Sequence, residues 1–257
     1  MSSPMFKELL QSGTPKLGLF VFEFATPGLA LIAQEARSDF LVLDMEHSGF
    51  GFETVKMVAL ACRGIGMPLA VRIAHRHPNE VSRALDAGGA AIMAPLVSTA
   101  DEARALVSWA SYPPEGTRGV GMILPHDGYR AGTVTDKTAD ANARRTLLVQ
   151  IETREGAENA DAIAAVPGVD CLWIGHMDLS CSLGIPGQFE HPDFKQAVAA
   201  VGAAARKHGK SLGRLAGTVP EARRLIDEGF GIVALYTDIG ALQQRLAEGI
   251  AAVRARS

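Results

Sequence analysis

The stretch TLLVQIETREGAENADAIAAVPGVDCLWIGH, residues 146–176, decides the fold because it contains one complete strand–helix–strand unit. Its two ends, 146–152 and 170–176, are short apolar runs that carry β-branched or aromatic residues, and the segment between them is helical in pattern. Two such runs joined by a helix predict neighbouring parallel strands.

The same alternation of strand and helix repeats along nearly the whole chain. Several runs are apolar at successive positions, as expected of strands that are covered on both faces. Pro27, Thr99 and Thr218 stand where three of the intervening helices are predicted to begin. The eight predicted strands are 16–23, 39–46, 68–74, 90–97, 146–152, 170–176, 211–216 and 230–237.

Eight units in 257 residues average about 32 residues each, which matches the size of a TIM barrel. We therefore predict an α/β fold, a (β/α)8 TIM barrel, as a single domain over residues 1–257. The rival is an open doubly wound sheet, which usually has a glycine-rich phosphate loop after its first strand. The corresponding segment FEFATPGLA, 22–30, has no GxGxxG. The irregular stretch 112–145 is predicted to be a long fourth βα crossover or a lid.

Composition excludes several classes of protein. With 47% hydrophobic and 21% charged residues, most of the chain is not disordered. The net charge of −3 and the absence of a basic run argue against nucleic acid or an anionic membrane as partner. Three cysteines without a CxxC pair indicate neither a disulfide framework nor a zinc site. No signal peptide or membrane-spanning apolar stretch is recognisable, so we expect a cytoplasmic protein.

Polar side chains follow four of the predicted strands at their carboxyl ends, where barrels carry their active sites. We expect these side chains to converge on one face of the barrel. They are Asp44, Glu46, His47, Arg72, Gln150, Glu152, His176 and Asp178.

Glu152 and Asp178 come from neighbouring predicted strands. Two carboxylates without a nearby cysteine suit a hard divalent cation, Mg²⁺ or Mn²⁺, and Co²⁺ is also compatible. The alternative is that each carboxylate caps the following helix or pairs with a surface cation.

His47 is the histidine that stands at a strand end beside carboxylates, so we interpret it as a general base or metal ligand, against a purely structural role. Arg72 lies within an apolar strand, where its charge needs an anionic partner. A structural carboxylate or a substrate carboxylate would serve equally. No lysine stands at the end of a predicted strand, which argues against Schiff-base catalysis.

Five segments together resemble the HpcH/HpaI family of metal-dependent pyruvate aldolases. The resemblance runs in order from about residue 16 to 240, and one departure is the pair His176 and Met177, where the family commonly has a proline-containing pair. The segments are LDMEH (43–47), VRI (71–73), PPEGTRGVG (113–121), VQIET (149–153) and IGHMDLSCSLGIPGQ (174–188).

The resemblance implies a class II aldolase, a carbon–carbon lyase, that cleaves or forms 4-hydroxy-2-oxo acids from pyruvate and an aldehyde. It implies that Glu152 and Asp178 hold the divalent metal and that no organic cofactor is needed. His47 would be the base and Arg72 the transition-state stabiliser. The remaining implied substrate contacts are Gln150, the backbone amides of Met177 and Asp178, and Leu215.

The resemblance also implies a homo-hexamer in which the last helix, 238–257, is exchanged between neighbours. Two carboxylates compete to orient His47. Asp44 is close in sequence, whereas Asp86 is the position that the resemblance selects. Since Asp86 ends a helix on the face opposite the active site, it would have to come from a neighbouring subunit.

Two other functions stay open at this point. One is an acyl-CoA thioester lyase of the related barrel type, and the other is a keto-acid-binding protein without turnover. The aldehyde half is unassigned: long acidic, sugar-derived and aromatic aldehydes all remain candidates, with contacts expected around Leu215 and in the stretch 120–145.

Overall fold

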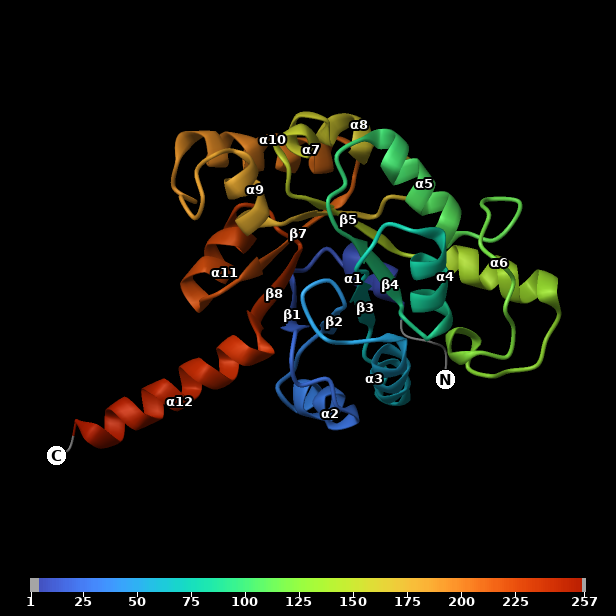
Figure 1. Ribbon diagram of the computed structural model, residues 1–257, viewed down its shortest axis with the longest axis horizontal. Coiled ribbons are helices and arrows are strands. Elements are labelled where there is room, and N and C mark those ends of the chain that lie inside the picture. Colours follow the sequence, from blue (N-terminus) through green and yellow to red (C-terminus); the bar gives the residue numbers. More distant parts are fainter. Residues whose placement is uncertain (1–4, 256–257) are drawn as a thin grey trace.

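The computed structural model describes residues 5–255, and in it eight parallel strands close into a barrel (Figure 1). Each strand pairs with its neighbours in chain order, and β1 pairs with β8 to close the ring. The barrel predicted from the sequence is confirmed, and the rival open sheet is wrong. The strands are β1 (Lys16–Val21), β2 (Phe40–Asp44), β3 (Leu69–Arg72), β4 (Ala91–Ala94), β5 (Leu147–Ile151), β6 (Cys171–Ile174), β7 (Ser211–Ala216) and β8 (Ile232–Thr237).

Helices surround this barrel, and their starts are capped as the sequence predicts. Pro27 is in the first turn of its helix, Thr99 and Glu102 form a capping box, and Thr218 accepts from the backbone N–H of Glu221. The surrounding helices are α2 (Pro27–Glu35), α3 (Phe52–Ile65), α4 (Pro78–Asp86), α5 (Ala100–Ala110), α7 (Arg154–Glu158), α8 (Ala160–Ala164), α10 (Pro192–Lys207) and α11 (Val219–Asp227). Helix α9 (His176–Ser182) follows β6 at the barrel mouth.

The apolar core has two layers. One fills the barrel interior with large side chains such as Phe20, Phe40, Met93 and Trp173. The other lies between the strands and the surrounding helices. A barrel filled in this way is a packed core rather than a pore, so a ligand can bind only at its ends.

Strand register places the polar strand ends at one edge. Asp44 is paired with Arg72 across β2 and β3, and Gln150 is paired with Trp173 across β5 and β6. The carboxyl ends of these four strands therefore open onto the same mouth.

The amino-terminal face is closed by α1 (Phe6–Gln11), a short helix that the sequence reading did not predict. Phe6 is fully buried, and its ring meets that of Phe40 edge to face at 5.5 Å. Closing this end leaves the opposite mouth as the site for chemistry.

The stretch 112–145 lies within the long connection between β4 and β5, as predicted for the fourth crossover, and it does not cover the barrel mouth as a lid would. It follows α5 and contains η1 (Pro125–Asp127) and α6 (Val134–Arg144), ahead of β5. Arg63, in the last turn of α3, donates to the carbonyls of Pro125 and His126. The carboxyl ends of the helices lie at the amino-terminal face of the barrel, so within one chain this stretch cannot contact an aldehyde at the mouth.

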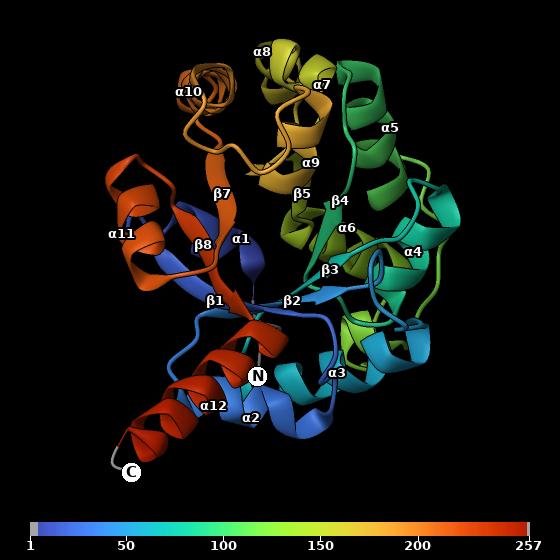
Figure 2. The same cartoon turned by 60° about the vertical axis from the view of Figure 1, so that its left-hand side comes forward.

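The last helix, α12 (Asp238–Arg254), leaves the barrel and points into solvent (Figures 1 and 2). Its base is fixed because Asp238 accepts the backbone N–H groups of Phe22, Glu23 and Phe24. Asp238 is also the one buried residue reported within the helix. The exchange between subunits predicted for 238–257 fits this projection but stays a prediction, and residues 256–257 lie outside the described part of the chain. Within residues 5–255, no helix combines the length and the hydropathy needed to cross a bilayer.

Candidate active site

A buried ion pair organises one side of the barrel mouth. Arg72 Nε lies 2.6 Å from Asp44 Oδ1, and Arg72 Nη1 lies 3.3 Å from Glu46 Oε2. The guanidinium carbon also lies 4.8 Å from the centre of the Phe20 ring and 5.5 Å from that of Phe22. The sequence allowed either a structural carboxylate or a substrate carboxylate as the partner of Arg72. In the structure, the structural carboxylates of Asp44 and Glu46 take this role.

His47 stands beside this pair, at the edge of the mouth. Its side chain is about half exposed, and its Nε2 atom lies 3.7 Å from Glu46 Oε2. Asp44 is directed elsewhere: its carboxylate accepts from Arg72 and from the backbone N–H groups of Glu46 and His47. Within one chain, the carboxylate beside the imidazole is therefore that of Glu46 and not that of Asp44. The sequence could have indicated this, because Glu46 directly precedes His47 in LDMEH.

Glu152 follows β5 and is almost completely buried. Its Oε1 atom accepts from the backbone N–H of Leu96 at 2.6 Å, and its Oε2 atom accepts from the Gln150 side-chain amide. The pKa of Glu152 is raised to about 7, mainly by burial; the hydrogen bonds from Leu96 and Gln150 act in the opposite direction, and the negative charges of Glu46 and Asp178 add to the rise. Burial also raises the pKa of Glu46, again with a contribution from Asp178. The charges of Glu46 and Asp178 thus both act on Glu152.

Asp178 reaches this place from the first turn of α9, which begins directly after Gly175. A Cβ atom added at Gly175 would overlap Glu152 Oε2 and lie 2.7 Å from the Glu152 Cβ and 2.9 Å from Gln150 Nε2. Only glycine lets the turn into α9 approach β5 this closely. The sequence reading did not assign a role to this glycine.

A cavity of about 350 Å³ opens at the mouth between these groups. Its size and its mixture of apolar walls with a few polar groups suit a small organic acid. The residues that line it are Phe20, Phe22, His47, Arg72, Gln150, Trp173, Ile174, Gly175, His176, Met177, Asp178 and Leu215.

The donor set at this cavity fits a hard divalent cation. Within residues 5–255 no group of three or more histidine, cysteine or acidic side chains is arranged to hold a metal ion. Glu152 and Asp178 nevertheless supply hard oxygen donors, and their repulsion with Glu46 is what a bound cation would relieve. Buried Gln150 Oε1 also has no hydrogen-bond partner in the described structure. Two carboxylates leave coordination positions for water and substrate oxygens, as Mg²⁺ sites usually do.

His176 and Met177, the two residues that depart from the pattern of the resembled family, begin α9 and line the cavity. The His176 ring lies 5.2 Å from the Phe189 ring, centre to centre. Burial, with a smaller contribution from the charge of Arg214, lowers the pKa of His176 to about 4. His176 is therefore neutral near pH 7. Met177 is largely exposed, and Leu215, from the neighbouring strand β7, is partly buried and also lines the cavity.

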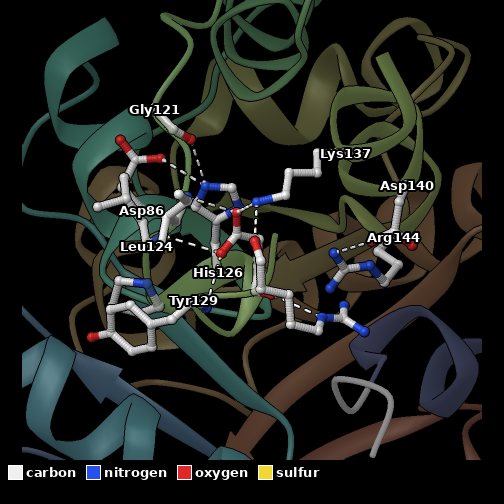
Figure 3. Close-up of polar contacts among 12 residues, drawn as sticks. Asp86, Gly121, Leu124, His126, Tyr129, Lys137, Asp140 and Arg144 are labelled. Carbon is white, nitrogen blue, oxygen red and sulfur yellow. Dashed lines mark hydrogen bonds and ion pairs between the residues drawn. The ribbon is translucent and has the colours of Figure 1, made fainter. Parts of the chain in front are cut away.

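Asp86 lies away from this mouth. It ends α4 and pairs with Arg118 at 2.5 Å, and His126 Nε2 lies 4.0 Å from the same oxygen (Figure 3). His126 Nε2 also lies 2.9 Å from the carbonyl oxygen of Gly121. The structure thus places Asp86 in a polar cluster with the stretch after α5, and a role beside His47 would require a neighbouring subunit.

Comparison with known proteins gives consistent matches over nearly the full length. The model of the family described as HpcH/HpaI aldolase/citrate lyase matches residues 16–244. A 5-keto-4-deoxy-D-glucarate aldolase from Klebsiella pneumoniae is 36% identical over 246 residues, 95% of each chain. An HpcH/HpaI family protein from Burkholderia cenocepacia superposes with a TM-score of 0.90 at 32% identity, over 96% of this chain and 98% of that one. An HpcH/HpaI aldolase from Desulfitobacterium hafniense gives 0.92 at 29% identity, over 98% and 97%.

Proposed function

Because this chain belongs to the HpcH/HpaI aldolase/citrate lyase family, we propose that it is a divalent-metal-dependent pyruvate aldolase acting on a 4-hydroxy-2-oxo acid. The chain is an enzyme, a carbon–carbon lyase of the aldolase type. The metal dependence, the substrate and the residue roles are our proposal.

One observation carries the proposal: Arg72, His47, Gln150 and Asp178 all line one cavity of about 350 Å³, and Glu152 accepts a hydrogen bond from the Gln150 side chain. An aldolase of this kind must hold a keto acid, stabilise negative charge on its keto oxygen and move a proton at the aldehyde oxygen. The cavity offers a group for each task.

Glu152 and Asp178 are the residues that would hold the cation. A bound Mg²⁺ or Mn²⁺ would act as a Lewis acid on the keto oxygen and so stabilise the enolate charge. Strand β5, Gly175 and helix α9 hold these two carboxylates near Glu46 before the substrate binds.

Arg72 is fixed in the cavity wall by Asp44 and Glu46. A guanidinium held in this way presents its remaining N–H groups without having to reorganise, which is favourable for stabilising charge that develops during a reaction. The Gln150 amide donates to Glu152, and its unpartnered Oε1 atom is available to accept from a hydroxyl group of the substrate.

His47 is placed to move the proton of the substrate hydroxyl. In the cleavage direction its imidazole would remove the proton from the 4-hydroxyl oxygen as the carbon–carbon bond breaks, and in synthesis it would return it. Glu46 Oε2 lies 3.7 Å from the imidazole Nε2 and is its nearest carboxylate within one chain. Asp86 of a neighbouring subunit is the second carboxylate that we propose for His47.

For the substrate we propose a sugar-derived diacid, because the Klebsiella pneumoniae relative is named a 5-keto-4-deoxy-D-glucarate aldolase. The test is release of pyruvate from 5-keto-4-deoxy-D-glucarate by the purified chain with Mg²⁺, with Arg72→Ala as a control for contaminating activity. Pyruvate release that Arg72→Ala abolishes supports the proposal. Equal release by both proteins, or turnover only of aromatic substrates, contradicts it. The hexamer and the cytoplasmic location also remain predictions.

Citrate lyase in the family description keeps an acyl-CoA thioester lyase as the second candidate. Among the lysine and arginine side chains of residues 5–255, only Arg72 lines the cavity, and it is engaged by two carboxylates. This is a poor surface for the phosphates of coenzyme A. Cleavage of an acyl-CoA thioester, without cleavage of any hydroxy-oxo acid, would favour this candidate. Binding of pyruvate without either turnover would favour the non-catalytic binding protein.

A further inference from the structure

A second cavity, of about 420 Å³, lies outside the barrel between α10 and α11, beside β7 (Figure 2 places these elements). No residue lines both this cavity and the catalytic one. Its walls are apolar where they meet the barrel, with three phenylalanines among them. The apolar lining residues are Phe189, Phe194, Val198, Ala199, Gly202, Leu212 and Phe230.

Arg214 is the deepest charged group at this cavity. It comes from β7 and is 3% exposed, and its guanidinium carbon lies 5.7 Å from the ring centres of both Phe189 and Phe194. Its Nη2 atom pairs with Glu221 Oε1 at 3.1 Å. Its Nε atom is buried and has no hydrogen-bond partner among the described residues.

The rim of the cavity carries an excess of positive charge. Lys195, Arg206, Arg214 and Arg224 line it, against Glu190 and Glu228. Glu190 is already engaged by Lys195 at 2.7 Å and by Arg224 at 3.0 Å. Arg206 has no ion-pair partner in residues 5–255. The cavity therefore combines apolar walls with the buried guanidinium of Arg214 and with Arg206, the one lining cation that has no ion-pair partner among the described residues, and this combination suits an anion that has an apolar body.

We propose that this second cavity is a binding site for a small aromatic carboxylate. Its carboxylate would pair with the guanidinium of Arg214, which lines the cavity, and Arg206 at the rim adds attraction for the negative charge. The Phe189 and Phe194 rings, 5.4 Å apart and inclined by 57°, offer edge and face contacts to a flat ring. Phosphate is the poorer match because its hydrated oxygens would face the phenylalanine walls.

Benzoate is the probe that tests this site, by isothermal titration and ligand-detected NMR on the full chain. We expect benzoate to bind saturably. Benzyl alcohol, the uncharged counterpart of benzoate, should bind at least tenfold more weakly. Oxalate with Mg²⁺, directed at the catalytic cavity, should not displace benzoate. Arg214→Met should weaken benzoate binding at least tenfold. Arg223→Met changes an exposed arginine of the adjacent helix α11 that does not line the cavity, and it should leave benzoate binding unchanged.

Arg214 is buried, so Arg214→Met can lose affinity through unfolding. Ala199→Trp avoids this problem because Ala199 is an exposed position of α10 that lines the cavity, and the larger ring would fill it. This variant should keep the circular dichroism spectrum and lose benzoate binding. The proposal is overturned if benzoate does not bind saturably, if oxalate displaces it, or if folded Ala199→Trp binds it as the unchanged chain does. None of these measurements depends on the proposed aldolase activity.

Discussion

Arg72 and Asp44 form an ion pair between the ends of neighbouring strands, with 2.6 Å between Nε and Oδ1 and both side chains less than a tenth exposed. The pair fixes the guanidinium in the wall of the catalytic cavity. It also fixes the turn after β2, because the same carboxylate accepts the backbone N–H groups of Glu46 and His47. In the proposed mechanism, stability and catalysis therefore both depend on this carboxylate.

Asp44→Asn should lower the free energy of unfolding by about 3 kcal/mol, because it leaves a buried guanidinium without its closest counter-charge. Urea denaturation at pH 7 measures this. Asp101→Asn is the matched control, since Asp101 pairs with Arg104 in solvent and such pairs contribute less than about 1 kcal/mol. Equal losses in the two variants would contradict the structural role of the pair.

Gly175→Ala should abolish aldol cleavage and weaken Mn²⁺ binding at least tenfold. The added methyl group occupies the position of Glu152 Oε2, so the carboxylate has to move or the start of α9 has to shift. Calorimetric titration with Mn²⁺ and the pyruvate-release assay are the measurements. Gly28→Ala, whose nearest neighbouring atom would be 3.8 Å away, is the control and should behave as the unchanged protein. An active Gly175→Ala enzyme would mean that Glu152 is not needed in its present position.

The protonation of Glu152 predicts a pH dependence of stability in the presence of a chelator. Its pKa is raised from 4.5 to about 7, so the folded state binds this proton more tightly than the unfolded chain does. The resulting stabilisation is fully present below about pH 4.5 and is lost as the pH rises through about 7.

Glu152→Gln mimics the protonated form, so its stability relative to the unchanged protein should rise by roughly 3 kcal/mol between pH 4.5 and 8. Denaturation at several pH values gives this difference. Glu158→Gln, at an exposed glutamate, should show little change. A flat difference for Glu152→Gln would mean that Glu152 does not carry the raised pKa.

Helix α12 presents exposed apolar side chains at helical spacing, Leu242, Leu246 and Ile250, and packs against the barrel mainly at its base. Leu246→Glu with Ile250→Glu should therefore convert an oligomer to monomers, as measured by light scattering during gel filtration. Gln243→Glu is the control and should not dissociate it. If Asp86 of a neighbour orients His47, the monomer should also be nearly inactive. A fully active monomer would contradict the role of Asp86 across subunits.

Much of this architecture is readable from the sequence because it depends on local patterns. The eight apolar runs and the caps at Thr99 and Thr218 are local signals, and the barrel then brings the polar strand ends together without further information. The sequence does not predict those elements whose position depends on tertiary contacts. Helix α6 has few apolar residues, with Asn142 as its buried residue, so it carries no periodic pattern. Phe6 becomes a core residue only because the barrel offers Phe40 as a partner.

Within the site, residue types were predictable but their partners were not. The sequence identified Arg72 as needing an anion, yet only the register between β2 and β3 selects Asp44. The raised pKa of Glu152 depends on burial and on carboxylates from two other elements, which no local pattern contains.

Exchange of the methyl protons of pyruvate for deuterium, followed by NMR, tests the central claim most directly. The account predicts exchange with Mg²⁺ or Mn²⁺, its loss after exhaustive treatment with a chelator, its return when the cation is restored, and its absence in Glu152→Gln and Asp178→Asn. Exchange that survives complete removal of divalent cations, or that both variants retain at full rate, would contradict the claim that Glu152 and Asp178 hold the metal for this reaction.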